Sequence, residues 1–108
     1  MPIIKFHIGD AHGDPQAIER LLHTVQQACV GLLRAQPDAV QIILLPGCRL
    51  LYGPACYVEV LYRGQAHRDA PVMERFMALL EAQVLEVWDV RPRIRCMAFH
   101  QPDLHARN

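Results

Sequence analysis

The sequence has no run of basic residues, and its 11 Lys and Arg are balanced by 11 Asp and Glu. Without a net positive field, a protein has little electrostatic attraction for nucleic acid or an anionic membrane. Its apolar runs, such as 42–45, are far shorter than the roughly 20 residues that a membrane-spanning helix needs. The first residues do not show the charged start and following apolar stretch that are typical of a secretory signal peptide. These absences predict a cytoplasmic protein that binds neither nucleic acid nor membrane.

Metal and redox motifs are also missing. The cysteines form no C-x-x-C pair, and no two of the 6 histidines are spaced for zinc on one helix face. Isolated cysteines in the cytoplasm are usually reduced and behave as small apolar side chains. We therefore expect no metal, no other cofactor and four inert thiols, which are Cys29, Cys48, Cys56 and Cys96.

What the sequence does contain is a strand–helix–strand pattern in its first half. Residues 3–8 and 40–45 are apolar and rich in β-branched side chains, which is typical of strands. Between them, apolar residues recur in steps of one and three over 17–33, as on one helix face. Asp14 can cap this helix, and Pro15 suits its first position.

The second half repeats the same order of elements. Residues 57–63 and 93–99 read as strands. The helix between them opens at Pro71 and ends before Pro92. Residues 100–108 read as a short tail.

Together the halves predict an α/β fold in a single domain over residues 1–108, with units at about 2–45 and 57–99. Each helix is long enough to connect two parallel strands, and such connections are right-handed. We expect a four-stranded mixed sheet with two helices on one face. Neighbouring strand residues such as Ile42 and Ile43 are apolar on both sides of the sheet, so the uncovered face should pack in an oligomer.

A ferredoxin-like domain has the same order of elements and is the alternative fold. Its acylphosphatase form needs an arginine-bearing phosphate loop directly after the first strand. Here residues 9–13 are acidic and contain no arginine. Phosphate binding at that loop is therefore disfavoured.

Two segments resemble known proteins. Residues 2–8, PIIKFHI, resemble the first strand of the tautomerase superfamily, which includes 4-oxalocrotonate tautomerase and macrophage migration inhibitory factor. Residues 56–65, CYVEVLYRGQ, look like a strand of a small uncharacterised bacterial family with the same fold. The resemblance implies a tautomerase-like fold, a mature chain that starts with proline, and a homotrimer, because members with two fused units form trimers.

The resemblance makes Pro2 the expected catalytic residue of a keto–enol tautomerase, an isomerase. Removal of Met1 would leave Pro2 with a free secondary amine. A hydrophobic pocket disfavours the charged form of that amine and lowers its pKa. The neutral amine could then act as general base on a small carbonyl or enol substrate.

Substrate binding is expected from cations near that amine. In 4-oxalocrotonate tautomerase two arginines bind the substrate, and their places fall here at His12 and Gln41, so that dicarboxylate is disfavoured. This departure supports the second hypothesis, a non-catalytic binding or interaction protein with the same fold. The expected substrate-binding residues are Arg95, Arg63, Arg34, Tyr62 and His12.

Overall fold

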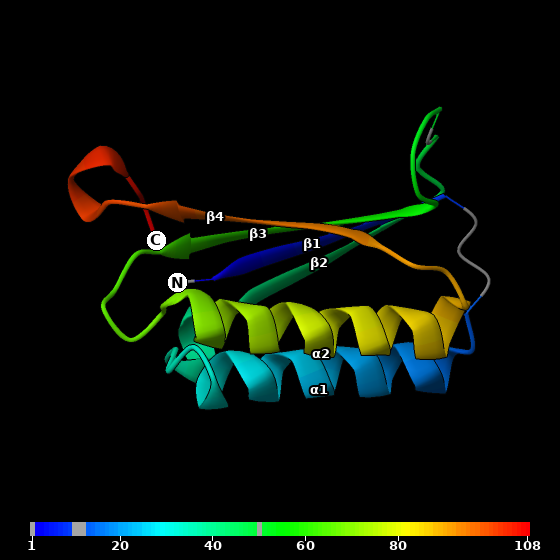
Figure 1. Ribbon diagram of the computed structural model, residues 1–108, viewed down its shortest axis with the longest axis horizontal. Coiled ribbons are helices and arrows are strands. Elements are labelled where there is room, and N and C mark those ends of the chain that lie inside the picture. The colour runs from blue at the N-terminus through cyan, green and yellow to red at the C-terminus, as the bar shows by residue number, and fades with distance from the viewer. Residues whose placement is uncertain (1, 10–12, 50) are drawn as a thin grey trace.

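The computed structural model describes residues 2–9, 13–49 and 51–108, and these form two layers (Figure 1). One layer is a sheet, and the other is a pair of helices packed on one side of it. In chain order the elements are β1 (Ile3–Ile8), α1 (Pro15–Gly31), the short helix η1 (Pro37–Ala39), β2 (Gln41–Pro46), β3 (Cys56–Arg63), α2 (Ala70–Trp88), β4 (Arg93–Phe99) and the short helix η2 (Gln101–Asp103).

The sheet has the strand order β2-β1-β3-β4. The β1–β2 and β3–β4 pairs are parallel, and each is connected by a helix. The central pair, β1 and β3, is antiparallel, with Ile3 opposite Leu61 and Ile8 opposite Cys56. The four-stranded mixed sheet with two helices on one face, expected from the sequence, is thus confirmed.

Both helices begin where the sequence predicts. The Asp14 carboxylate accepts a hydrogen bond of 3.4 Å from the Gln16 N–H at the start of α1. In α2, the Asp69 carboxylate accepts one of 3.1 Å from the Val72 N–H. Each cap satisfies a backbone donor that has no partner inside the helix.

The end of α1 differs from the prediction. Apolar spacing continues to Leu33, but the regular helix stops at Gly31. Arg34 has a left-handed φ of 55°, and the Ala35 N–H donates to the Cys29 carbonyl at 3.0 Å. This bond, together with the left-handed Arg34, turns the chain and satisfies a carbonyl of the last helical turn. The apolar side chain of Leu33 remains buried in the turn that follows.

Alternate strand residues form the core beneath the helices. In β1 these are Ile4, Phe6 and Ile8, all at most 2% exposed. Side chains of β3 and one face of each helix complete the layer, because alternate residues of a strand share one side of the sheet. The other core side chains are Leu21, Val25, Ala28, Cys29, Leu33, Ala35, Cys56, Val58, Val60, Tyr62, Met73, Phe76, Leu80 and Val84.

The opposite side of the sheet carries no helix, and we call it the open face (Figure 1). Across its middle, Lys5 stands beside Glu59, and Glu59 stands beside Arg95. The Lys5 ammonium lies 3.8 Å from the Glu59 carboxylate, which also accepts a 2.9 Å hydrogen bond from the Tyr57 hydroxyl. The other open-face side chains, largely apolar, are Ile3, His7, Gln41, Ile43, Leu45, Leu61, Arg63, Arg93, Met97 and Phe99.

Two kinds of feature are missing from the parts of the chain that the structure describes. Neither α1 nor α2 combines the length and the apolar character needed to cross a bilayer. No three or more His, Cys, Asp or Glu side chains gather closely enough there to hold a metal ion.

Buried thiols make stability depend on pH at the alkaline end. Burial raises the pKa of Cys29 to about 12 and that of Cys56 to about 11. An acid with a raised folded-state pKa stabilises the fold fully below its unfolded pKa, which is near 9. This stability is lost as the pH rises toward the folded-state value, because only the unfolded chain ionises easily.

We predict that the free energy of unfolding falls between pH 9 and 11 less steeply in Cys29→Ala than in the wild type. The difference in slope should be about 1.4 kcal/mol per pH unit, the value for one proton. Urea unfolding at a series of pH values measures it. Val25→Ala, which removes apolar contacts without a titrating group, should keep the wild-type slope. Equal slopes in Cys29→Ala and the wild type would contradict the prediction.

Candidate functional site

Pro2 lies buried at one end of the sheet, directly before β1. Its side chain is less than 2% exposed. The Pro2 carbonyl accepts a 3.0 Å hydrogen bond from the Gln41 N–H, which joins it to the start of β2. One step beyond the Ile3–Leu61 pair, the antiparallel register places Pro2 opposite Tyr62. The pyrrolidine ring therefore belongs to the helix-covered side, in surroundings that disfavour a charged amine.

Several chain segments meet at this end of the sheet. Figure 1 shows the start of β1 near the end of β3 and the first turn of α2. Arg68, in the connection from β3 to α2, is only 7% exposed. Its Nε donates to the Leu33 carbonyl at 2.8 Å, and its Nη1 donates to the Arg63 carbonyl at 2.9 Å. Arg68 thus fastens the end of α1 to the end of β3.

The Leu33 carbonyl receives a second donor. The His67 Nε2 lies 3.0 Å from the same oxygen, so it serves as the donor in this contact. Carbonyls at the end of a helix carry partial negative charge and lack partners within the helix. His67 and Arg68 together supply these partners.

Positive charge gathers here without a carboxylate to neutralise it. The Nε of Arg63 is buried and has no hydrogen-bond partner among the residues that the structure describes. Burial first, and then the nearby Arg63 guanidinium, lower the pKa of Arg68. Within the described ranges, the one ion pair is Lys5–Glu59, on the open face. Two close guanidinium groups without an acidic partner favour an anionic ligand.

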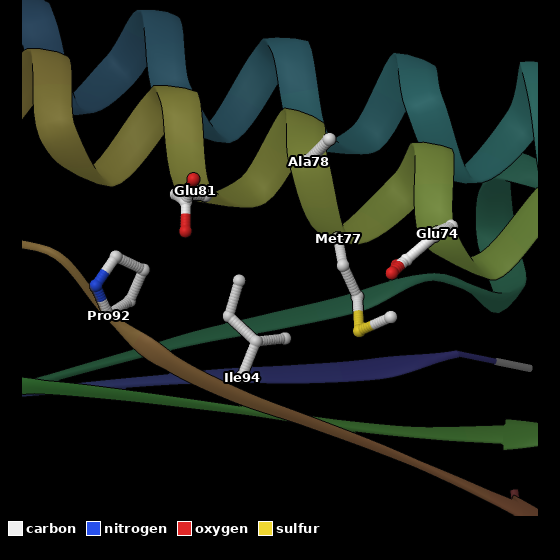
Figure 2. A pocket seen from close by; sticks show the side chains of 6 residues that line it. All are labelled: Glu74, Met77, Ala78, Glu81, Pro92 and Ile94. Atoms are coloured by element: carbon white, nitrogen blue, oxygen red, sulfur yellow. The ribbon is translucent and has the colours of Figure 1, made fainter.

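A groove between α2 and the edge strand β4 leads to this end. Figure 2 shows its far part, where Glu74 and Met77 hang from α2 toward Ile94 on β4. These three residues also line the hollow at the near part, so the groove is continuous. The remaining side chains of the far part are Ala78, Glu81 and Pro92, and those of the near part are Tyr62, Arg68, Asp69, Ala70, Met73, Arg95 and Cys96.

The structure gathers some of the residues singled out from the sequence. Pro2, Tyr62 and Arg63 lie at the same end of the sheet. Burial is also the main cause that raises the pKa of the Tyr62 phenol. Arg34 is at this end too, exposed just beyond α1.

One predicted site residue is placed differently. Arg95 lies in the middle of β4, exposed, with its Nη1 donating to the Ile94 carbonyl at 2.8 Å. It lines the groove with Tyr62 and Arg68. His12 lies outside the described residues. The sequence-based prediction missed Arg68. A residue between a strand and a helix cap such as Asp69 is usually exposed to solvent, and the two carbonyls that bind Arg68 come from separate parts of the chain.

Sequence comparison identifies no relatives. No protein-family model and no curated protein matches the chain.

Solved structures do match. A domain of unknown function (DUF1904) from Sebaldella termitidis ATCC 33386 aligns with a TM-score of 0.73 and 12% identity over 98% of this chain and 95% of that one. A fused 4-OT, described as a wild-type symmetric trimer, aligns with a TM-score of 0.71 and 14% identity over 97% of this chain and 93% of that one. A malonate semialdehyde decarboxylase aligns with a TM-score of 0.69 and 13% identity over 98% of this chain and 91% of that one. At these identities the likeness concerns the fold.

Arg68 is predicted to be a structural link at this site. Arg68→Met should lower the free energy of unfolding by about 2–4 kcal/mol, because the Leu33 and Arg63 carbonyls lose a charged donor. Arg68→Lys should have a free energy of unfolding between those of the wild type and Arg68→Met, since an ammonium group cannot make both hydrogen bonds of the guanidinium in the same geometry. Urea unfolding measures both. Arg75→Met, on the exposed side of α2, should change stability by less than about 0.5 kcal/mol; a similar value for Arg68→Met would disprove the link.

Proposed function

Because the chain has the fold of the tautomerase superfamily, we propose that it is an isomerase that uses the amine of Pro2 as general base. The observation that carries the proposal is the burial of Pro2 beside cations that lack acidic partners. The proposal requires removal of Met1, which frees the amine. A small residue in the second position is compatible with that removal.

The proposed reaction is a keto–enol tautomerisation. The neutral Pro2 amine takes a proton from the carbon next to a carbonyl, or from an enol hydroxyl, and returns it at the other position. A general base is most effective when its pKa lies near the working pH, and burial lowers the amine pKa toward that range. The pyrrolidine ring is less than 2% exposed, so its amine would lie close to this low-dielectric region.

Arg63 and Arg68 suit a substrate with a carboxylate. The unpartnered Nε of Arg63 is the free donor of the pair, whereas Arg68 already bonds to two carbonyls. A cation near the reacting carbon stabilises the enolate that forms when the proton leaves. Arg95 and Tyr62 line the groove that leads to this point. Arg34, exposed just beyond α1, adds positive charge at the same end of the molecule. The proposed substrate is therefore a small keto or enol acid.

A non-catalytic binding protein with this fold is the second candidate. The specific observation in its favour is Gln41, whose N–H bonds to Pro2 at the place where 4-oxalocrotonate tautomerase would have an arginine. A neutral amide there gives a dicarboxylate less attraction. Activity on monocarboxylic enols distinguishes the two candidates.

We further propose a cytoplasmic homotrimer assembled through the open face. Half-buried and exposed apolar side chains such as Leu61 and Met97 lie there without a helix to cover them. Removal of such a surface from water favours association. The fused 4-OT with the same fold is described as a symmetric trimer.

The catalytic proposal predicts that the purified native protein lacks Met1 and accelerates the ketonisation of phenylenolpyruvate, a monocarboxylic enol. Pro2→Ala should reduce kcat/KM by about 10²–10⁴, the usual contribution of a positioned base. Arg63→Gln should mainly raise KM for a carboxylate substrate. Intact-mass spectrometry and ultraviolet absorbance provide the measurements.

Pro54→Ala, in the loop before β3, is the matched proline control and should keep the wild-type rate. Retention of Met1 in the native protein, or equal rates in Pro2→Ala and the wild type, would overturn the catalytic proposal. The fold would be unaffected by either result.

The assembly is predicted to depend on Met97, which is 44% exposed in the single chain. Met97→Glu should convert the trimer to monomers, because each subunit would have to bury a carboxylate in the contact. Ala78→Glu, on the exposed side of α2, should leave the trimer intact. Light scattering coupled to gel filtration reports the mass. A wild-type monomer, or a Met97→Glu trimer, would disprove assembly through the open face.

A further inference from the structure

A cysteine and a histidine meet at the end of the sheet opposite Pro2. The Sγ of Cys48 lies 3.9 Å from the Nδ1 of His7, a residue of β1 that faces the open side. Two contacts hold the cysteine there: its N–H donates to the Ile8 carbonyl at 3.2 Å, and its thiol donates to the Leu45 carbonyl at 3.0 Å. The pair is thus built by the ends of β1 and β2.

Cys48 differs from the other cysteines of the chain. Cys29 and Cys56 are fully buried, and burial raises their pKa to about 12 and about 11. Cys96 is partly buried, and desolvation raises its pKa to about 11. Such thiols ionise poorly and react slowly. Cys48 is partly buried, like Cys96, but it is the one cysteine among the described residues with an imidazole in contact. The expectation of four inert thiols is therefore open to test at Cys48.

Apolar, aromatic and charged side chains surround His7 on the open face. On its β2 side lies the apolar Leu45, and on its β3 side lies Tyr57, whose ring centroid is 5.6 Å away at an angle of 39°. The charged open-face groups nearest to it are Lys5 and Glu59, which pair with each other, and, beyond Tyr57, Arg93 of β4. Arg49 follows Cys48 in the loop. Among the described residues no carboxylate bonds to the imidazole, and the Cys48 thiol, which donates to the Leu45 carbonyl, lies within reach of the ring.

We propose that Cys48 is a thiol–disulfide exchange site, with His7 as its base and low-molecular-weight disulfides as its substrates. The Cys48 thiol gives its proton to the Nδ1 of His7. The thiolate attacks one sulfur of the disulfide RSSR, so that a Cys48–SR bond forms and the S–S bond of RSSR breaks. The leaving thiolate takes the proton from the imidazolium and departs as RSH. One disulfide is consumed and one is formed, so no further oxidant is needed.

This site is separate from the proposed isomerase site. His7 and Pro2 are at opposite ends of β1, and Cys48 follows the carboxyl end of β2. The exchange reaction needs neither removal of Met1 nor the Pro2 amine. Failure of one activity would therefore leave the other untouched.

The test uses dithiobis(nitrobenzoate), a coloured low-molecular-weight disulfide, on the native full-length protein. One thiol per chain should react quickly, and peptide mapping should place the label on Cys48. Cys48→Ser should abolish the fast phase. His7→Asn should slow labelling at pH 7 by about tenfold or more, because the positioned base that takes the thiol proton is lost. His23→Asn, an exposed histidine of α1, is the matched control and should react like the wild type.

The wild-type pH profile gives a readout that does not depend on the folding of a variant. A thiol activated by an imidazole should remain reactive below the ordinary thiol pKa and lose its reactivity as the imidazole is protonated independently at low pH. A rate that follows one ordinary thiol titration would overturn the role of His7. Labelling of Cys48 no faster than that of Cys29 or Cys56 would overturn the site itself.

Discussion

The antiparallel pairing of β1 with β3 is the contact on which the rest of the structure depends. Each strand–helix–strand unit has only two strands, too few for an independent stable sheet. The ladder from Ile3–Leu61 to Ile8–Cys56 joins the two units into four strands. It also places both helices on the same side, where their apolar faces share one core. Without this ladder, each helix would pack against a sheet of only two strands.

The same pairing determines where chemistry can occur. One face of the sheet is filled by core side chains, and the middle of the other carries the Lys5–Glu59 pair. The two proposed sites therefore lie at the ends of the strands, where the backbone hydrogen bonds of the sheet stop. Pro2 with Arg63 and Arg68 lies at one end, and Cys48 with His7 at the other. The two ends are separated by the length of β1, so their environments can be tuned independently.

Most of the fold was predictable because its signals are local. Alternation of apolar residues, the caps at Asp14 and Asp69, and the prolines after them specify strands and helix starts within a few neighbouring positions. The end of α1 was less predictable, because Leu32 and Leu33 keep the helical spacing although a left-handed Arg34 has begun a turn. The site was harder still. Arg68 and Cys48 obtain their partners from residues 35 and 41 positions away, and no local pattern encodes such contacts.

The two units are related by an approximate half-turn about an axis between β1 and β3, yet their first strands begin in chemically different ways. In the second unit, the residue that precedes the first strand, β3, is Ala55. The nitrogen of Ala55 is held in a peptide bond, because the chain passes through it from the preceding loop. Joining two units in one polypeptide therefore halves the number of chain starts available for amine chemistry. The residue before β3 carries no free amine, so its identity is not constrained by amine chemistry.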